Sequence, residues 1–181
     1  MTTQIKTHSP SMTASAAGPA GADITQYLTF VLGSEMFAIG ILGIKEIIEY
    51  TGLTPVPLMP ACILGVMNLR GAVVPVMDLA SRFGKPATVV TKRTCIVIVE
   101  VAAEGERHDM GLLVDAVNAV LEIPASEIEP APAFGARIRS DFIEGMGKVN
   151  GKFVILLNVN RVLSVEELGA LAGEAAPLLL A

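Results

Sequence analysis

Tryptophan is absent from the 181-residue sequence, and charged residues make up only 17% of it. The net charge is −5 at pH 7, so the chain shows no sign of the basic face by which a protein binds nucleic acid. No apolar run approaches the roughly 18 residues of a membrane-spanning helix, and we expect no direct membrane insertion. Hydrophobic residues nevertheless reach 52%, which indicates a core or partner surfaces that cover them.

The residue types that usually carry catalysis are scarce. His8 falls in the N-terminal tail, and His108 falls in a polar turn where a solvated side chain is expected. Cys62 and Cys95 lie in apolar surroundings, which indicates buried free thiols in a reducing cytoplasm rather than a disulfide. No cysteine and histidine spacing matches a zinc site, and no glycine-rich phosphate loop or nucleophile elbow is present. We therefore predict that the protein is not an enzyme and uses no cofactor or metal.

Two carboxylates, Asp78 and Asp115, each follow an apolar strand and are the best candidates for a catalytic or metal-binding pair. A structural role is favoured for both. Asp78 precedes a short segment that ends near Phe83 and can act as its helix N-cap. Asp115 lies at a strand exit, where a short polar side chain can accept hydrogen bonds from backbone amides.

Alternating apolar residues predict β-strands along most of the chain. Residues 26–32 and 36–41 are predicted to form a hairpin, and so are residues 142–149 and 152–157 around the turn pair Asn150-Gly151. Further strands are predicted at residues 63–69, 72–77, 94–101, 109–114 and 118–122. Many short strands separated by turn residues are typical of small β-barrels.

Two segments depart from the strand pattern. Ile44, Ile47 and Ile48 recur at helical spacing, so a short helical or irregular segment is expected after the first hairpin. A C-terminal helix is predicted over residues 165–172, because Ser164 can serve as its N-cap with Glu167 three residues further on.

The chain also contains an internal repeat. A shift of 80 residues aligns Gly71 with Gly151 and Asp78 with Asn158. A shift of 73 residues aligns the apolar residues Ile39, Ile41, Ile44, Ile47 and Ile48 with Leu112, Val114, Val117, Val120 and Leu121. We infer two copies of one module, made of a strand, a kinked connection, a hairpin and a short capped helix. Each copy alone would be marginally stable, so the two are expected to share an interface.

These patterns predict an all-β fold of two packed barrels with short helices. Residues 1–23 are rich in small and polar side chains and are predicted to form a disordered tail. We expect the first barrel at residues 24–90 and the second at residues 91–165, with the possibility that strands exchange between them. Residues 166–181 are expected to contain the C-terminal helix and tail.

Arg70 is the only charged residue between Pro60 and Met77, and it is predicted to lie at a turn between two apolar strands. Two roles remain open for it. A hairpin tip needs a solvated residue, but a guanidinium group also suits an interface where it binds carboxylates. Glu46, among the three isoleucines, has the same two possible roles as a solvent-facing charge or as part of an interface rim.

Three sequence segments resemble the conserved segments of the CheW family of chemotaxis coupling proteins. The first is ILGVMNLRGAVVPVMDL at residues 63–79, the second is GLLVD at residues 111–115, and the third is FIEGMG at residues 142–147. The resemblance runs from about Gln26 to about Leu168. It implies two packed five-stranded SH3-like β-barrels and no catalytic activity. It also implies two partners, the regulatory domain of a CheA-type histidine kinase and the cytoplasmic tip of methyl-accepting chemoreceptors.

The resemblance further implies which residues contact each partner. Receptor contact is expected at Arg70, Glu46, Asn68, Gly65, Val117 and Val120. Kinase contact is expected at Leu28, Ile41 and Ile44. The protein would then be a cytoplasmic adaptor recruited to receptor arrays. Three alternatives remain: an adaptor of a related twitching or second-messenger pathway, a separated kinase regulatory domain, and a small β-barrel enzyme or ligand carrier.

Overall fold

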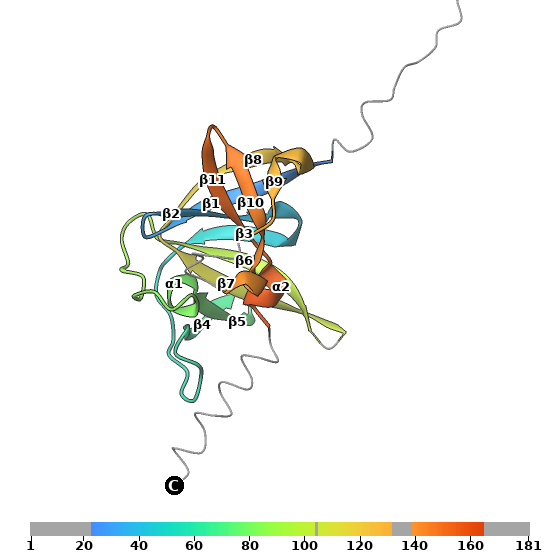
Figure 1. Cartoon of the computed structure of the whole chain (residues 1–181). Helices are drawn as coiled ribbons and strands as arrows, with labels where there is room; N and C mark the ends of the chain where they lie inside the picture. The colour runs from blue at the N-terminus through green and yellow to red at the C-terminus, as the bar shows by residue number, and fades with distance from the viewer. Residues whose placement is uncertain (1–22, 104, 132–138, 165–181) are drawn as a thin grey trace, which may run out of the picture.

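A computed structural model describes residues 23–103, 105–131 and 139–164 of the chain (Figure 1). The described residues form a six-stranded and a five-stranded β-sheet, and their helices are single turns. The all-β prediction is therefore confirmed, with one strand more than expected in the larger sheet. The predicted disordered tail, apart from Asp23, and the predicted C-terminal helix lie outside the described residues.

The six-stranded sheet has the order β8-β1-β2-β11-β10-β9. Its strands are β1 (Ile24–Leu32), β2 (Glu35–Gly40), β8 (Ala116–Pro124), β9 (Ile128–Glu129), β10 (Ile143–Val149) and β11 (Lys152–Leu157). The five-stranded sheet has the order β3-β6-β7-β5-β4. Its strands are β3 (Ile44–Glu49), β4 (Ile63–Leu69), β5 (Ala72–Asp78), β6 (Cys95–Ala103) and β7 (Glu106–Val114). The short helices are η1 (Ile41–Gly43), α1 (Leu79–Arg82), η2 (Ala125–Glu127), η3 (Ser140–Phe142) and α2 (Val159–Val162).

The two sheets do not follow the two halves of the chain. Hairpin β1–β2 pairs in parallel with β11, whereas hairpin β6–β7 pairs in parallel with β5. Each sheet therefore contains strands from both halves of the chain, with β1 and β2 beside β8 to β11 in one and β3 to β5 beside β6 and β7 in the other. The barrel bounds at residues 24–90 and 91–165 stay a prediction. Only η1 separates β2 from β3, and only Asp115 separates β7 from β8. Each of these short connections carries the chain directly from one sheet to the other.

The largest hydrophobic core lies between the two sheets, as the expected shared interface requires. It combines Leu28 and Phe30 of β1 with Val97 and Val99 of β6, all buried. Successive strand residues point to opposite faces, so Ile96 points away from this core into a smaller cluster enclosed by the five-stranded sheet. A strand that is buried on both faces reads as a continuous apolar run, as β6 does.

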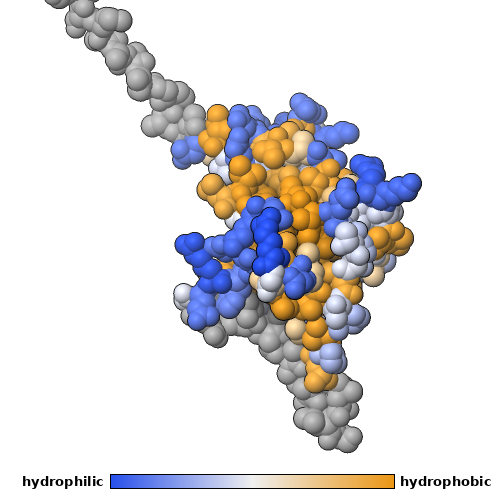
Figure 2. Space-filling view, turned by 180° about the vertical axis from the view of Figure 1, so that it is seen from behind, coloured by the Kyte–Doolittle hydropathy of each residue, from blue (hydrophilic) through white to orange (hydrophobic). Residues whose placement is uncertain are grey.

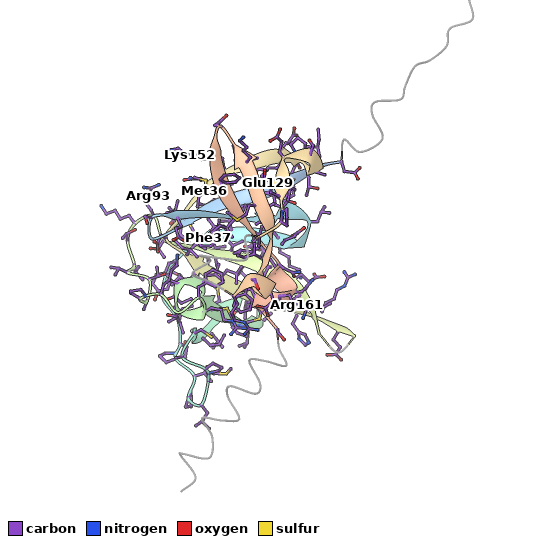
Figure 3. The ribbon with its side chains drawn as sticks, viewed as in Figure 1. Met36, Phe37, Arg93, Glu129, Lys152 and Arg161 are labelled. Atoms are coloured by element: carbon purple, nitrogen blue, oxygen red, sulfur yellow. The ribbon has the colours of Figure 1, made fainter. Side chains whose placement is uncertain are left out.

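A row of aromatic rings crosses this core. Phe37 stacks on Phe30 with 6.2 Å between ring centroids and on Phe83 with 5.6 Å. Phe83 in turn contacts Phe142 at 5.9 Å. Figure 3 shows Phe37 in the interior of the molecule, whereas Arg93 and Lys152 lie at its periphery. The row links β1 and β2 of the six-stranded sheet to the C-cap of α1, which follows β5 of the five-stranded sheet, and to η3.

The prediction of a helical or irregular segment around Ile44 is wrong, because these residues form strand β3. Ile44 pairs with Val99 and Glu46 pairs with Ile98, so Lys45 is the extra residue of a β-bulge. The bulge breaks the two-residue alternation and produces an apolar spacing that resembles a helix. β-branched isoleucines and the free edge of β6 favour the strand.

The predicted helix cap at Asp78 is confirmed, and its repeat equivalent Asn158 caps a helix as well. The buried carboxylate of Asp78 accepts hydrogen bonds from Ala80 N at 3.1 Å and Ser81 Oγ at 3.1 Å. It also accepts from Thr88 N at 2.9 Å and Thr88 Oγ1 at 2.8 Å. Asn158 caps α2 by accepting from Arg161 N at 3.3 Å. Asp115 Oδ2 accepts from Gly33 N at 2.7 Å, so both aspartates have the structural roles that the sequence favoured.

Candidate functional site

The hairpin turn between β4 and β5 holds Arg70 in an unusual backbone conformation. Arg70 and Gly71 both have positive φ angles, of 50° and 86°. Their repeat equivalents Asn150 and Gly151 have φ angles of 51° and 77°. Two positive φ angles define a type I′ turn, for which Asn-Gly is preferred. A left-handed conformation costs an arginine about 1 kcal/mol. The stability of the turn therefore does not explain why an arginine occupies this position.

The strained turn carries an exposed ion pair. Arg70 Nη1 lies 2.8 Å from Glu46 Oε2, and the Arg70 side chain is 79% exposed. Glu46 reaches this position because the bulge at Lys45 turns it to the same face as Ile98. An exposed ion pair contributes only about 0–1 kcal/mol to stability. The pair therefore hardly offsets the strain, and it leaves a guanidinium group accessible to a partner.

Asn68 and Gly65 shape the hairpin that presents Arg70. Asn68 Oδ1 accepts a hydrogen bond from Gly71 N at 2.9 Å, which closes the turn from within. Gly65 lies where the backbone of Thr54 crosses β4, and Thr54 and Val66 exchange hydrogen bonds of 2.9 and 2.8 Å. A Cβ atom on Gly65 would collide with Thr54 O and lie 2.8 Å from Thr54 C. Both residues therefore position the hairpin.

The remaining residues expected to contact a receptor lie on β8. Val117 is half-buried and packs against the core between the sheets, to which Ile44 also belongs. Val120 is exposed, and it pairs with Leu28 at the edge of the six-stranded sheet. The structure thus brings Arg70 and Glu46 into contact, but places Val120 on the other sheet.

Of the residues expected to contact a kinase, Leu28 is not at the surface. Its side chain is only 3% exposed because β1 is covered on both faces. Ile41 and Ile44 are half-buried at the two ends of the connection η1. Between them, Leu42 is 96% exposed and was missed by the sequence prediction. The sequence did contain one indication of this exposure. Leu42 breaks the two-residue alternation of Phe37, Ile39 and Ile41, so its side chain was not expected on their buried face.

Some of the many hydrophobic residues of the chain remain exposed on the surface of the folded protein. Figure 2 shows one face on which hydrophobic surface runs along the middle, with hydrophilic groups on either side. The exposed large hydrophobic residues include Leu42, Ile47, Leu58, Met59, Val73, Val120 and Phe153. Contiguous exposed apolar surface is typical of proteins that bind other proteins.

Residues 23–103, 105–131 and 139–164 contain no group of three or more potential metal ligands. Cys62 and Cys95 are free, and burial raises the pKa of the Cys62 thiol. No helix in these ranges has the length and hydropathy required to cross a bilayer.

Comparisons with known proteins are consistent with each other. The CheW-like domain matches residues 26–167. Chemotaxis protein CheW of Rhizobium meliloti is 34% identical over 142 residues, which cover 78% of this chain and 89% of that protein. CheW of Klebsiella aerogenes is 34% identical over 143 residues, covering 79% of this chain and 84% of that protein.

A solved structure extends the likeness to the fold. The scaffolding protein TtCheW from Thermoanaerobacter tengcongensis superposes with a TM-score of 0.70 at 33% identity. The match covers 78% of this chain and 88% of that chain, and it includes the two SH3-like barrels. The chain therefore belongs to the CheW family and is a non-catalytic adaptor of chemotaxis.

Proposed function

We propose that the protein links methyl-accepting chemoreceptors to the regulatory domain of a CheA-type histidine kinase. It would act in the cytoplasm at receptor arrays, where receptor state controls kinase activity. The observation that carries this proposal is the exposed Arg70–Glu46 pair on a turn that arginine does not favour. Strain that serves no structural purpose points to a binding role.

The receptor site is proposed to centre on Arg70 and Glu46. The guanidinium group can bind a carboxylate of the helical receptor tip through two parallel hydrogen bonds. Val117 and Val120 add apolar contact area along β8, which suits a helix that docks in a groove. Asn68 and Gly65 contribute by holding the turn, because their recorded contacts are within the hairpin and with Thr54.

The kinase site is proposed at the crossing between β2 and β3. Ile41 and Ile44 are half-buried there and Leu42 is almost fully exposed, so the three form a small apolar surface. An exposed leucine next to two half-buried isoleucines is the kind of anchor that a partner can desolvate. Leu28 lies beneath the surface and supports it through the core.

Kinase autophosphorylation in the presence of receptor-bearing membranes tests the proposal. Wild-type protein is expected to activate the kinase, and Arg70→Glu is expected to abolish most of the activation because it repels the receptor carboxylates. Lys152→Glu is the matched control, since it changes the same charge at the equivalent hairpin of the six-stranded sheet. No activation by wild type, with kinase and receptor from the same organism, would contradict the coupling role.

A further inference from the structure

Strands β5 and β7 are neighbours in the sheet, but only their C-terminal residues pair with each other. Their N-terminal residues diverge. Their parallel pairing covers only Val76–Asp78 with Gly111–Leu113. Residues 72–75 of β5 pair on their far side with β4, and residues 106–110 of β7 pair on their far side with β6. In the described chain, no strand pairs with the sides of these two segments that face each other. Two unpaired strand edges therefore face one another.

The space between these edges is an open cleft of about 610 Å³. One wall is formed by residues 72–75 and the other by residues 107–110, with Met59, Pro60 and Ile63 alongside. Every second residue of an antiparallel ladder directs its N–H and C=O away from its partner strand. The walls thus offer hydrogen-bonding backbone groups beside apolar side chains, including Val73, which is 70% exposed.

The charges at the cleft neutralise each other. Lys45 Nζ lies 2.8 Å from Asp109 Oδ1 and 3.2 Å from Glu100 Oε2. Arg107 Nη1 lies 3.0 Å from the other carboxylate oxygen of Glu100. The hydrogen bonds with Asp109 and then Glu100 raise the pKa of Lys45. Since each of these cations is paired with a carboxylate, the cleft is complementary to an uncharged occupant.

In the other repeat copy, the unpaired strand segment that corresponds to this edge is shorter. Strand β2 begins at Glu35, only two residues before it pairs with β11 at Phe37. Strand β7 begins five residues before its pairing at Gly111. The longer β6–β7 hairpin therefore creates an edge that the other copy lacks. Phe153, which is equivalent to Val73 by the shift of 80, is 52% exposed on β11 and provides an internal control.

We propose that this cleft, defined by residues 72–75 and 107–110, binds an extended, uncharged, apolar segment of a partner protein by β-strand addition. The segment forms main-chain hydrogen bonds with β7 and packs alternate side chains against Met59, Ile63 and Val73. This surface shares no residue with the Arg70–Glu46 pair, although Lys45 and Ala72 connect the two along the chain, and the proposal does not rest on the receptor or kinase sites proposed above.

A capped peptide of alternating threonine and valine, with two serines at each end for solubility, is a direct and uncharged probe. Its binding to the full chain is followed by NMR shifts and by amide hydrogen exchange. Shifts confined to residues 72–75 and 107–110 and to Met59, Pro60 and Ile63 alongside them are expected, with slowed exchange of the amides of residues 107–110 that face the cleft. Val73→Glu should weaken the affinity at least about tenfold, whereas Phe153→Glu should leave it unchanged.

A second peptide separates strand addition from simple apolar binding. It has the same side chains, but alternate backbone nitrogens are methylated and cannot donate hydrogen bonds. Loss of binding by this peptide is the expected result. Equal binding of both peptides, binding at other residues, absence of binding up to about millimolar concentration, or self-association of the chain through this cleft in place of peptide binding would overturn the proposal.

Discussion

Hairpin β4–β5 with helix α1 and hairpin β10–β11 with helix α2 are repeat equivalents that differ in a few informative side chains. Both hairpins turn through two residues with positive φ, and both helices begin at a polar N-cap. The second hairpin has Asn150 at its turn, the residue type that this backbone prefers, whereas the first has Arg70. The shared features are required by the fold. Under the proposed function, the departure at Arg70 is the one that serves the binding of a partner.

The helix caps give the largest expected difference between the two copies. Asp78 accepts four hydrogen bonds in a buried position and ties the segment at Thr88 to α1, whereas Asn158 accepts one recorded hydrogen bond. Asp78→Ala is expected to lower the free energy of unfolding by about 3 kcal/mol. Asn158→Ala should lower it by about 1 kcal/mol. Urea denaturation of both variants measures the difference, and equal losses would contradict this comparison.

Gly65 and Gly145 are repeat equivalents that each follow the extra residue of a β-bulge, and their substitutions are expected to differ next. A Cβ atom on Gly65 would meet the backbone of Thr54 and Pro55, whereas one on Gly145 would first meet Ile128 Cγ2, at 2.7 Å. The Ile128 side chain can change its rotamer, which leaves Glu129 O at 3.0 Å as the only backbone atom within about 3 Å of that Cβ, whereas the backbone of Thr54 must shift. Gly65→Ala should therefore cost about 2 kcal/mol and Gly145→Ala clearly less, by thermal or urea unfolding. A larger loss for Gly145→Ala would show that β9 is the more rigid neighbour.

The turns themselves allow an exchange test. Asn150→Arg places arginine in the same left-handed conformation that Arg70 adopts, without a recorded reason to favour it. The free energy of unfolding should fall by about 1 kcal/mol. No change in stability would mean that arginine is not strained in this turn, and the argument from Arg70 would lose its basis.

The crossing between β2 and β3 is expected to show the smallest effect on stability. Leu42 is almost fully exposed, so Leu42→Ser should change the free energy of unfolding by less than about 0.5 kcal/mol. Kinase affinity should nevertheless fall about thirtyfold if Leu42 is an anchor of that interface. Val89→Ser, at another exposed hydrophobic residue, is the control, and equal affinities of the two variants would argue against the proposed kinase site.

Local chemistry explains how much of this structure could be predicted from the sequence. The turn pairs, the caps at Asp78 and Asn158 and the repeat were predictable because they depend on neighbouring residues. Strand β3 was not, because one bulge residue changes the apolar spacing of the whole segment. The exchange of hairpins between the sheets was predicted only as a possibility. The alternation of apolar and polar residues along a strand is the same whichever sheet the strand joins.

The charged residues of the candidate site could be predicted from the sequence, but the exposure of its apolar residues could not. Arg70 and Glu46 were recognisable because charges are rare in their surroundings, and the structure joins them in an ion pair. The burial of Leu28 could not be predicted, because it depends on the five-stranded sheet packing against β1 in the shared core. The exposure of Leu42 is equally a product of the crossing between sheets.

The most direct test of the account measures receptor binding and stability together on Arg70→Asn. This substitution gives the first hairpin the turn residue of the second. The account predicts that the free energy of unfolding stays the same or rises by up to about 1 kcal/mol, while affinity for the receptor tip falls about thirtyfold. Unchanged affinity in the folded variant would contradict the claim that Arg70 is retained for binding.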